Sequence, residues 1–210
     1  DRYDILLVAD EVICGFGRTG NMWGSETFNI RPDIVTAAKA LSSAYLPISA
    51  VIISEKVYGP IKDQANELGI FGHGYTYSAH PVCAAVAMKA QQIMIDRNII
   101  ENVKQLSKLF NERIQNIKNN SWFLSHSRSV GLIGAVEFGH EGNKKFDIKN
   151  KIAAKCAKII QENGVILRAL PGDIIGFCPP LIIKEEQINE MFDKIDIAFK
   201  NFDEMAFNLK

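Results

Sequence analysis

The chain has 210 residues, of which 47% are hydrophobic and 23% charged, a composition ordinary for a globular protein with one or two small cores. Lysine plus arginine equals aspartate plus glutamate at 24 each, so the chain offers no basic field for nucleic acid and no acidic tail. No apolar run approaches the roughly 18 residues of a membrane-spanning helix, and the scattered cysteines predict reduced thiols in a cytoplasmic protein.

The first forty residues contain two short apolar runs that each end in charged side chains. Residues 5–9 (ILLVA) lead into Asp10 and Glu11, and residues 34–38 (IVTAA) lead into Lys39. Neither run alternates apolar and polar residues, which is typical of strands covered on both faces of a parallel sheet. Because ligands bind beyond the carboxyl ends of parallel strands, we expect Asp10 and Lys39 to face one site at that edge.

A glycine-rich turn, Gly15-Phe-Gly17-Arg-Thr-Gly20, separates the two runs and has the GxGxxG spacing of a dinucleotide site. Such a site needs a helix that begins at the third glycine, so that its N-terminus can hold the pyrophosphate. Residues 21–32 instead lack a helical period and end in a proline, and the two acids before the turn would crowd the phosphates. The sequence therefore disfavours a dinucleotide.

The middle of the chain predicts a third buried strand at residues 49–54 and a surface helix at residues 57–68. An irregular loop rich in glycine and aromatic residues follows at 71–78. Pro81 suits the first position of a helix over residues 81–95. The next helix has one apolar face, which comprises Ile99, Val103, Leu106, Phe110, Ile114 and Ile117.

The pattern changes near Ser121 to shorter elements. We expect strands at residues 130–138, 165–170 and 174–177, and an amphipathic helix at 148–161. A last helix follows Pro179 and Pro180, and its predicted buried stripe comprises Ile188, Met191, Phe192, Ile195 and Phe199. Residues 1–120 thus predict an α/β unit, and residues 121–210 a small α+β unit.

Asp10 and Lys39 each allow two interpretations. Lys39 could be a lysine that extends from a sheet edge into water, and Asp10 a simple turn carboxylate. Alternatively, Lys39 lies in a desolvated pocket, where its amine is a nucleophile toward carbonyl groups. An acid and a lysine on successive strand ends match the needs of pyridoxal phosphate, whose ring nitrogen takes a carboxylate and whose aldehyde takes a lysine.

Three stretches carry a resemblance to a known family: LLVADEVICGFGRTG, the PDI and AKAL motifs around Lys39, and GYTYSAHPV. Together they resemble the class III aminotransferases, fold type I enzymes that use pyridoxal phosphate. The run AKALSSAYLPISAVIIS is especially similar to the ω-amino acid:pyruvate transaminase branch. The resemblance implies an α/β fold, in which residues 1–120 form part of the large domain, a mostly parallel sheet with helices. Residues 121–210 would form the small α+β C-terminal domain.

The resemblance also implies roles for particular residues in binding the cofactor. Asp10 would pair with the pyridine nitrogen, and Val12 would pack against one face of the ring. Lys39 would form a Schiff base with the cofactor and later carry the proton between the substrate Cα and the cofactor. Thr76 would bind the cofactor phosphate across a dimer interface, and Tyr75 would line the partner subunit's pocket.

Arg168, alone in the run VILRAL, matches the arginine that receives a substrate carboxylate in a forked pair. Without the resemblance we would interpret Arg168 as a surface residue of an edge strand. Glu11 is expected to have a structural role beside the ring. His73 and His80 lie near each other but lack a third ligand at zinc spacing, so no metal site is predicted.

The resemblance implies a homodimeric transaminase that moves an amino group from an amine or ω-amino acid to a keto acid such as pyruvate, in a ping-pong cycle. Members of the family are considerably longer than this chain, which enters a strand within its first residues. We therefore expect a C-terminal fragment whose N-terminal half is missing. An aminomutase and a decarboxylase share these motifs, and a non-catalytic assembly partner also remains open.

Overall fold

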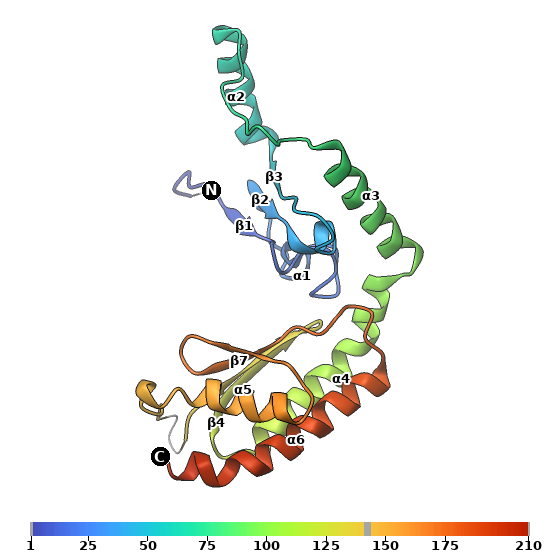
Figure 1. Cartoon of the computed structure of the whole chain (residues 1–210). Coiled ribbons are helices and arrows are strands. Elements are labelled where there is room, and N and C mark those ends of the chain that lie inside the picture. The colour runs from blue at the N-terminus through green and yellow to red at the C-terminus, as the bar shows by residue number, and fades with distance from the viewer. Residues whose placement is uncertain (1, 141–143, 210) are drawn as a thin grey trace. The chain divides into compact units, whose positions relative to one another are not determined.

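The computed structural model describes residues 2–140 and 144–209, and the chain forms two compact units, Asp1–Glu101 and Asn102–Lys210 (Figure 1). Among the helices of these described ranges, none has both the length and the apolar character needed to cross a membrane. The chain is an α/β protein in which each unit contains its own sheet.

The first unit contains a three-stranded sheet in the order β1-β2-β3, as far as its residues are described. Its elements in chain order are β1 (Val8–Asp10), α1 (Gly24–Thr27), β2 (Ile34–Ala37), the 3-10 turn η1 (Lys39–Leu41), β3 (Ala50–Ile53), α2 (Glu55–Leu68) and α3 (Pro81–Asp96).

The sheet of the first unit is mixed, which corrects the prediction of a mostly parallel sheet. Strands β1 and β2 are parallel, with Asp10 opposite Thr36, whereas β2 and β3 are antiparallel, with Ala37 opposite Ala50. A parallel return from β2 would need a connection that crosses over a face of the sheet, usually as an α-helix. The chain instead turns back through the 3-10 turn η1, so β3 runs in the opposite direction.

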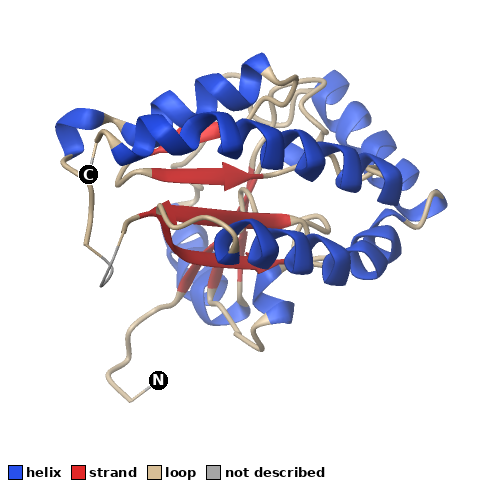
Figure 2. Ribbon diagram, turned by 90° about the horizontal axis from the view of Figure 1, so that it is seen from below, coloured by secondary structure: helices blue, strands red, loops and turns tan. Residues whose placement is uncertain are grey.

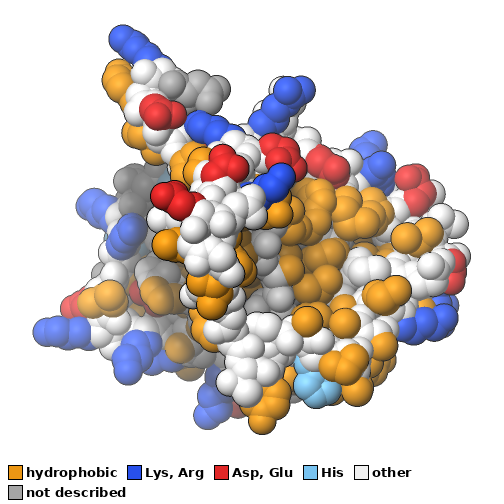
Figure 3. All heavy atoms as spheres, turned by 90° about the horizontal axis from the view of Figure 1, so that it is seen from above, with side chains coloured by type: hydrophobic (Ala, Val, Ile, Leu, Met, Phe, Trp, Pro, Cys, Tyr) orange, Lys and Arg blue, Asp and Glu red, His pale blue; other side chains and the backbone are white. Residues whose placement is uncertain are grey.

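The strands of the first unit are more exposed than their apolar sequences predict. The side chains of Val8, Val51 and Ile52 are 54%, 68% and 47% exposed. No residue of α2 is buried, so that helix does not cover the sheet. Figure 3 displays hydrophobic side chains gathered between charged ones at the surface. The expectation that these strands are covered on both faces is therefore wrong for this chain by itself.

The two long helices of the first unit follow their sequence signals. Helix α3 begins at Pro81, whose missing N–H group costs nothing at the first helical position. Helix α2 begins at Glu55, slightly before the predicted start, and ends at Leu68, where it is capped by Gly69, whose φ of +70° lies in the left-handed region.

The second unit contains a four-stranded antiparallel sheet in the order β4-β5-β7-β6, counted over its described residues. Figure 2 shows strands of the chain in red beside its helices in blue. Helix α4 (Ile99–Asn119) leads into it. The remaining elements are β4 (Leu124–Val130), β5 (Ile133–Phe138), the 3-10 turn η3 (Ile148–Asn150), α5 (Ile152–Glu162), β6 (Arg168–Leu170), β7 (Ile174–Phe177) and α6 (Glu185–Phe207).

Strand β4 was not predicted because its sequence, LSHSRSV, is mostly polar. It is an edge strand, and the hydroxyls of Ser127 and Ser129 donate hydrogen bonds to Gln115 and Asn111 of α4. The strand predicted over residues 130–138 divides at Gly131, whose φ of +56° forms the turn between β4 and β5. Polar contacts with a helix thus replace the hydrophobic alternation that a strand usually shows.

Two further elements are shorter than predicted. The expected helix at residues 148–161 begins only at Ile152, because Lys151 has a φ of +48° and interrupts it. Before that point the Asp147 carboxylate accepts a hydrogen bond from the Lys149 amide and stabilises a separate 3-10 turn. Strand β6 comprises only the last residues of the run predicted at 165–170.

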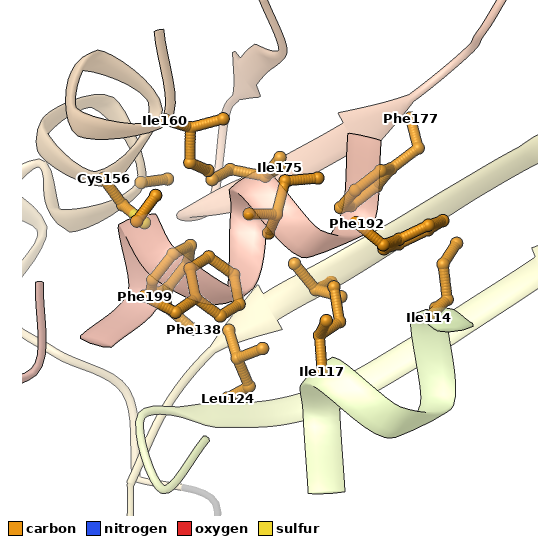
Figure 4. Packing of buried hydrophobic residues seen from close by; sticks show 14 of the residues in the cluster. Ile114, Ile117, Leu124, Phe138, Cys156, Ile160, Ile175, Phe177, Phe192 and Phe199 are labelled. Atoms are coloured by element: carbon orange, nitrogen blue, oxygen red, sulfur yellow. The ribbon is translucent and has the colours of Figure 1, made fainter. Parts of the chain in front are cut away.

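The core of the second unit lies between its helices and its sheet (Figure 4). The predicted apolar face of α4 is buried at all six positions, and the predicted stripe of α6 is buried except at Met191, which is half-buried. Gly134 of β5 allows the close approach of α4, since a Cβ there would collide with the Cδ1 atom of Ile114. Because α4 contributes to this core, it packs with the second unit.

Candidate active site

The carboxyl ends of β1 and β2 form one edge of the first sheet, which we call the carboxyl edge. Asp10 ends β1, and Lys39 follows β2 after a single residue. Since the two strands are parallel neighbours, their ends meet at the same edge. The predicted placement of the two strand ends at one edge is therefore confirmed, whereas a shared site for the Asp10 carboxylate and the Lys39 amine stays a prediction.

The Asp10 carboxylate is oriented by two hydrogen bonds to its Oδ1 atom. The Val12 amide donates one at 3.1 Å, and the Thr36 hydroxyl donates the other at 3.1 Å from the neighbouring strand. No hydrogen bond from the described residues reaches Oδ2, and the side chain is exposed. The carboxylate is thus fixed through one oxygen while the other can accept a hydrogen bond from a ligand.

Glu11 has a structural role, as predicted, and its hydrogen bonds show what that role is. Its side chain is only 3% exposed, and its two carboxylate oxygens accept hydrogen bonds from the amides of Gly24 (2.8 Å) and Ser25 (2.6 Å). These amides belong to the first turn of α1, whose N-terminus carries a partial positive charge. Glu11 therefore ties the end of β1 to the start of α1.

The same contacts argue against a dinucleotide at the glycine-rich turn. Helix α1 begins at Gly24 rather than at Gly20, it is only four residues long, and the Glu11 carboxylate occupies its N-terminus. The glycines serve the shape of the loop: Gly17 and Gly20 have φ values of +98° and +93°, a region that favours glycine. The GxGxxG spacing of this turn therefore does not indicate a phosphate-binding site.

Lys39 occupies an unusual backbone conformation at the carboxyl edge. It is the first residue of η1, and its φ of +44° lies in the left-handed region, where non-glycine residues are uncommon. The side chain is exposed and makes no ion pair with any residue in the described ranges. The interpretation that Lys39 lies in a desolvated pocket is thus wrong for this chain alone, although its amine is available to a ligand.

The other residues predicted to bind the cofactor lie in two places. Val12 is half-buried and directly follows the acids of β1. Tyr75 and Thr76 lie in a turn that the Ser78 side chain closes by accepting a hydrogen bond of 3.0 Å from the Tyr75 amide. Tyr75 is 77% exposed. Among the described residues, no hydrogen bond or ion pair joins this turn to Asp10 or Lys39, so the chain does not bring these residues together by itself.

Arg168 belongs to the second unit, where it begins β6 and pairs with Gly176 of β7. Its side chain is exposed and makes no ion pair within the described ranges. It lines an open, mainly apolar groove of about 610 Å³ together with Ile166, Leu167, Ala169, Gly176, Phe177, Cys178, Pro179, Pro180, Ile183 and Met191. A guanidinium at the rim of an apolar groove can bind a carboxylate whose carbon chain lies in that groove.

Two residues that contact this region were not identified from the sequence. Thr36 orients Asp10, and Gln91 of α3 donates hydrogen bonds to the carbonyls of Ala40 and Leu41, which follow Lys39. The only sequence signal for Thr36 is a hydroxyl within an apolar strand. Gln91 gives no signal, because polar residues are common on the exposed side of a helix.

No metal site is found in the parts of the chain that the structure describes. No group of three or more histidine, cysteine, aspartate or glutamate side chains converges there. His73 and His80 are both exposed, and His73 packs edge-on against Tyr75, with a centroid separation of 5.4 Å.

Comparison with known proteins assigns the chain to a family. The model of the family described as aminotransferase class III matches residues 1–199. An uncharacterized aminotransferase, y4uB, of Sinorhizobium fredii is 41% identical over 95% of this chain and 44% of its own length. The mitochondrial gamma aminobutyrate transaminase 1 of Solanum lycopersicum is 42% identical over 100% of this chain and 41% of its own length.

Solved structures agree with this assignment. A transaminase with L-alanine has a TM-score of 0.92 and 41% identity, covering 97% of this chain and 48% of that one. The omega transaminase from Pseudomonas jessenii in complex with PMP has a TM-score of 0.92 and 38% identity, covering 98% of this chain and 46% of that one. The chain spans about half the length of the relatives it matches. It belongs to the class III aminotransferases.

Proposed function

We propose that the chain forms part of a pyridoxal-phosphate-dependent transaminase. The enzyme would move an amino group from an amine or ω-amino acid to a keto acid such as pyruvate in a ping-pong cycle. The names of relatives, gamma aminobutyrate transaminases and omega transaminases, support an amino group distant from a carboxylate in the donor.

The observation that carries this proposal is the arrangement of the carboxyl edge. A carboxylate fixed through one oxygen ends β1, and an exposed lysine follows the parallel strand β2. These are the two groups that the cofactor requires at the two ends of its ring, an acid for the pyridine nitrogen and an amine for the aldehyde. The residues present therefore fit pyridoxal phosphate.

When bound, pyridoxal phosphate supplies an aldehyde that accepts amines and a ring that withdraws electrons. Asp10 would hold the proton on the ring nitrogen through its available Oδ2 atom, while Thr36 and the Val12 amide keep the carboxylate oriented. The Val12 side chain would pack on one face of the ring. Lys39 would hold the aldehyde end of the cofactor. Once released, its amine would take a proton from the substrate Cα and deliver a proton to the cofactor.

Substrate carboxylates would be bound by Arg168, whose guanidinium has no competing ion pair in the described ranges. A forked pair with a carboxylate would orient the keto acid, and the apolar groove beside it would hold the carbon chain. We propose that Thr76 binds the cofactor phosphate of a second subunit and that Tyr75 lines that subunit's pocket, which would make the enzyme a homodimer. Their exposed turn supports this assignment.

We also propose that the two units belong to the large and small domains of a fold type I enzyme. The exposed side chains of Val8, Val51 and Ile52 leave an apolar sheet surface that water solvates poorly. The N-terminal half of the same enzyme would cover this surface and complete the site. The predicted domain boundary at residue 120 and the predicted cytoplasmic location stay predictions, and several plant relatives are named as mitochondrial or chloroplastic.

The test is a transamination assay of the intact enzyme with pyruvate and an ω-amino acid donor. The wild-type protein should form alanine at the expense of the donor, and the initial-rate pattern should be that of a ping-pong reaction. Lys39→Ala should abolish alanine formation, whereas Lys56→Ala, which removes an exposed lysine paired with Asp4, should not. Isomerisation or decarboxylation of the donor without use of pyruvate would contradict the proposal.

A further inference from the structure

The side-chain amide of Gln91 connects helix α3 to the chain immediately after Lys39. Its Nε2 atom donates hydrogen bonds to the carbonyl oxygens of Ala40 at 3.0 Å and Leu41 at 2.9 Å. A carboxamide nitrogen carries two hydrogens, and here they serve two consecutive carbonyls. Gln91 therefore fixes the directions of the two peptide groups that follow the lysine.

The turn that Gln91 contacts is strained. Lys39, Ser43 and Ala44 have φ values of +44°, +51° and +62°, all in the left-handed region. Non-glycine residues in this conformation persist only where the surrounding structure holds them, and they cluster at functional sites. Ser42 provides part of that support, because its buried hydroxyl donates a hydrogen bond of 2.7 Å to the Leu46 carbonyl. Gln91 provides support from outside the turn.

Helix α3 holds Gln91 in place for this contact. The buried residues of this helix are Ala87, Ala90 and Met94. Gln91, which lies between Ala90 and Met94 in the sequence, is half-buried. Its amide thus reaches the turn from a helix that itself lies against η1. The next residue offers a contrast: Gln92 is exposed, and its Nε2 atom donates a hydrogen bond of 2.7 Å to Asp96 on the same helix.

We propose that Gln91 is a positioning residue for Lys39. It holds the strained segment 39–44, which begins with η1, so that the lysine amine is presented at the carboxyl edge. This inference rests on the proposed function of Lys39 as the residue that bonds the cofactor. Gln91 itself touches neither Lys39 nor a ligand, and it acts through the carbonyls of Ala40 and Leu41.

The sharpest variant is Gln91→Glu, which keeps the size of the side chain but replaces the donor by a second acceptor. A carboxylate facing two carbonyl oxygens repels them, so the turn should be released. Gln91→Asn retains the donor but shortens the side chain, and it should show a partial effect. Gln92→Glu is the matched control, because it makes the same chemical change one residue further along the same helix.

Three measurements on the intact protein test the proposal: amide hydrogen exchange of residues 39–45, the rate of borohydride trapping of pyridoxal phosphate on Lys39, and the thermal midpoint. In Gln91→Glu, exchange should quicken and trapping should slow, each by about tenfold or more, as expected for the loss of two hydrogen bonds. Gln92→Glu should leave both rates near the wild-type values. Both rates are measured at a temperature well below the thermal midpoint of each variant, where both proteins are folded, which separates a local effect from general destabilisation.

The possible results distinguish this inference from the function on which it rests. Equal trapping rates in Gln91→Glu and Gln92→Glu would overturn the positioning role, even if exchange quickened, because Gln91 would then support only the fold. A fall in trapping that merely follows a lower thermal midpoint would overturn it as well. Absence of any Lys39 adduct in the wild-type protein would instead contradict the proposed function.

Discussion

The hydroxyl of Thr36 donates a hydrogen bond of 3.1 Å to Oδ1 of Asp10, across the parallel pair that β1 and β2 form. The strand register creates this contact, since Thr36 lies directly opposite Asp10. Together with the Val12 amide, it leaves one carboxylate oxygen to a ligand. An acid at a strand end thereby becomes an oriented group rather than a mobile one.

Replacement of this hydroxyl should weaken the function of Asp10. In Thr36→Val the shape of the side chain is kept but one hydrogen bond to the carboxylate is lost, so we expect turnover and cofactor affinity to fall by about tenfold. Thr36→Ser keeps the hydroxyl and should remain close to wild type. Cofactor titration followed by absorbance and steady-state kinetics would measure both effects, and an unchanged Thr36→Val protein would remove the proposed orienting role.

Arg168 should control the affinity for the keto acid. Arg168→Ala removes a forked ion pair to the substrate carboxylate, so KM for pyruvate should rise roughly 10- to 100-fold while KM for an amine without a carboxylate changes little. Arg168→Lys keeps the positive charge but cannot form the forked pair, so its KM for pyruvate should lie between those of the wild type and Arg168→Ala.

The control for this experiment is Arg128→Ala, which removes another exposed arginine of the same sheet, one that pairs with Glu137. It should leave both KM values unchanged. Equal increases in KM for the keto acid and the simple amine in Arg168→Ala would show that this residue does not recognise a carboxylate.

Local sequence patterns predicted much of the backbone around the site. Apolar runs before Asp10 and Lys39 located two strands, and a proline located the start of α3. The buried face of α4 was predicted from its helical period, because its positions from Val103 to Ile117 contact the same core. These features depend on neighbours within a few residues along the chain.

Features that depend on distant residues could not be predicted. The hydrogen bonds of Thr36 to Asp10 and of Gln91 to the turn after Lys39 join residues far apart in sequence. Strand β4 lacks alternation because its serines bond to α4. The exposure of Val8 and Val51 depends on what covers the sheet, and apolar character alone does not reveal that.

Phe192 should dominate the stability of the second unit. Its side chain is fully buried, stacks on Phe177 with a centroid separation of 5.8 Å, and meets Phe110 edge-on at 5.8 Å. Phe192→Ala should therefore lower the free energy of unfolding by about 3–5 kcal/mol in urea denaturation. Ile197→Ala, at an exposed position of the same helix, should change it by less than about 0.5 kcal/mol. Equal losses would contradict the assignment of the core.

The cysteines should differ sharply in reactivity. Cys156 is fully buried in the core, and burial raises the pKa of its thiol well above the usual range. Cys178 is exposed in the groove that Arg168 lines. Since the thiolate is the reactive form, iodoacetamide at about pH 8 should label Cys178 in the folded protein and Cys156 only after unfolding. Peptide mass spectrometry measures this, and early labelling of Cys156 would contradict the packing of α5.

Borohydride reduction of the intact enzyme with pyridoxal phosphate, followed by peptide mass spectrometry, tests directly whether Lys39 bonds the cofactor. We expect a phosphopyridoxyl group on the peptide that contains Lys39 and none on the peptide that contains Lys56. An adduct confined to Lys39 would identify the cofactor and the lysine together. A protein that binds no pyridoxal phosphate, or carries it on another lysine, would contradict the proposed site.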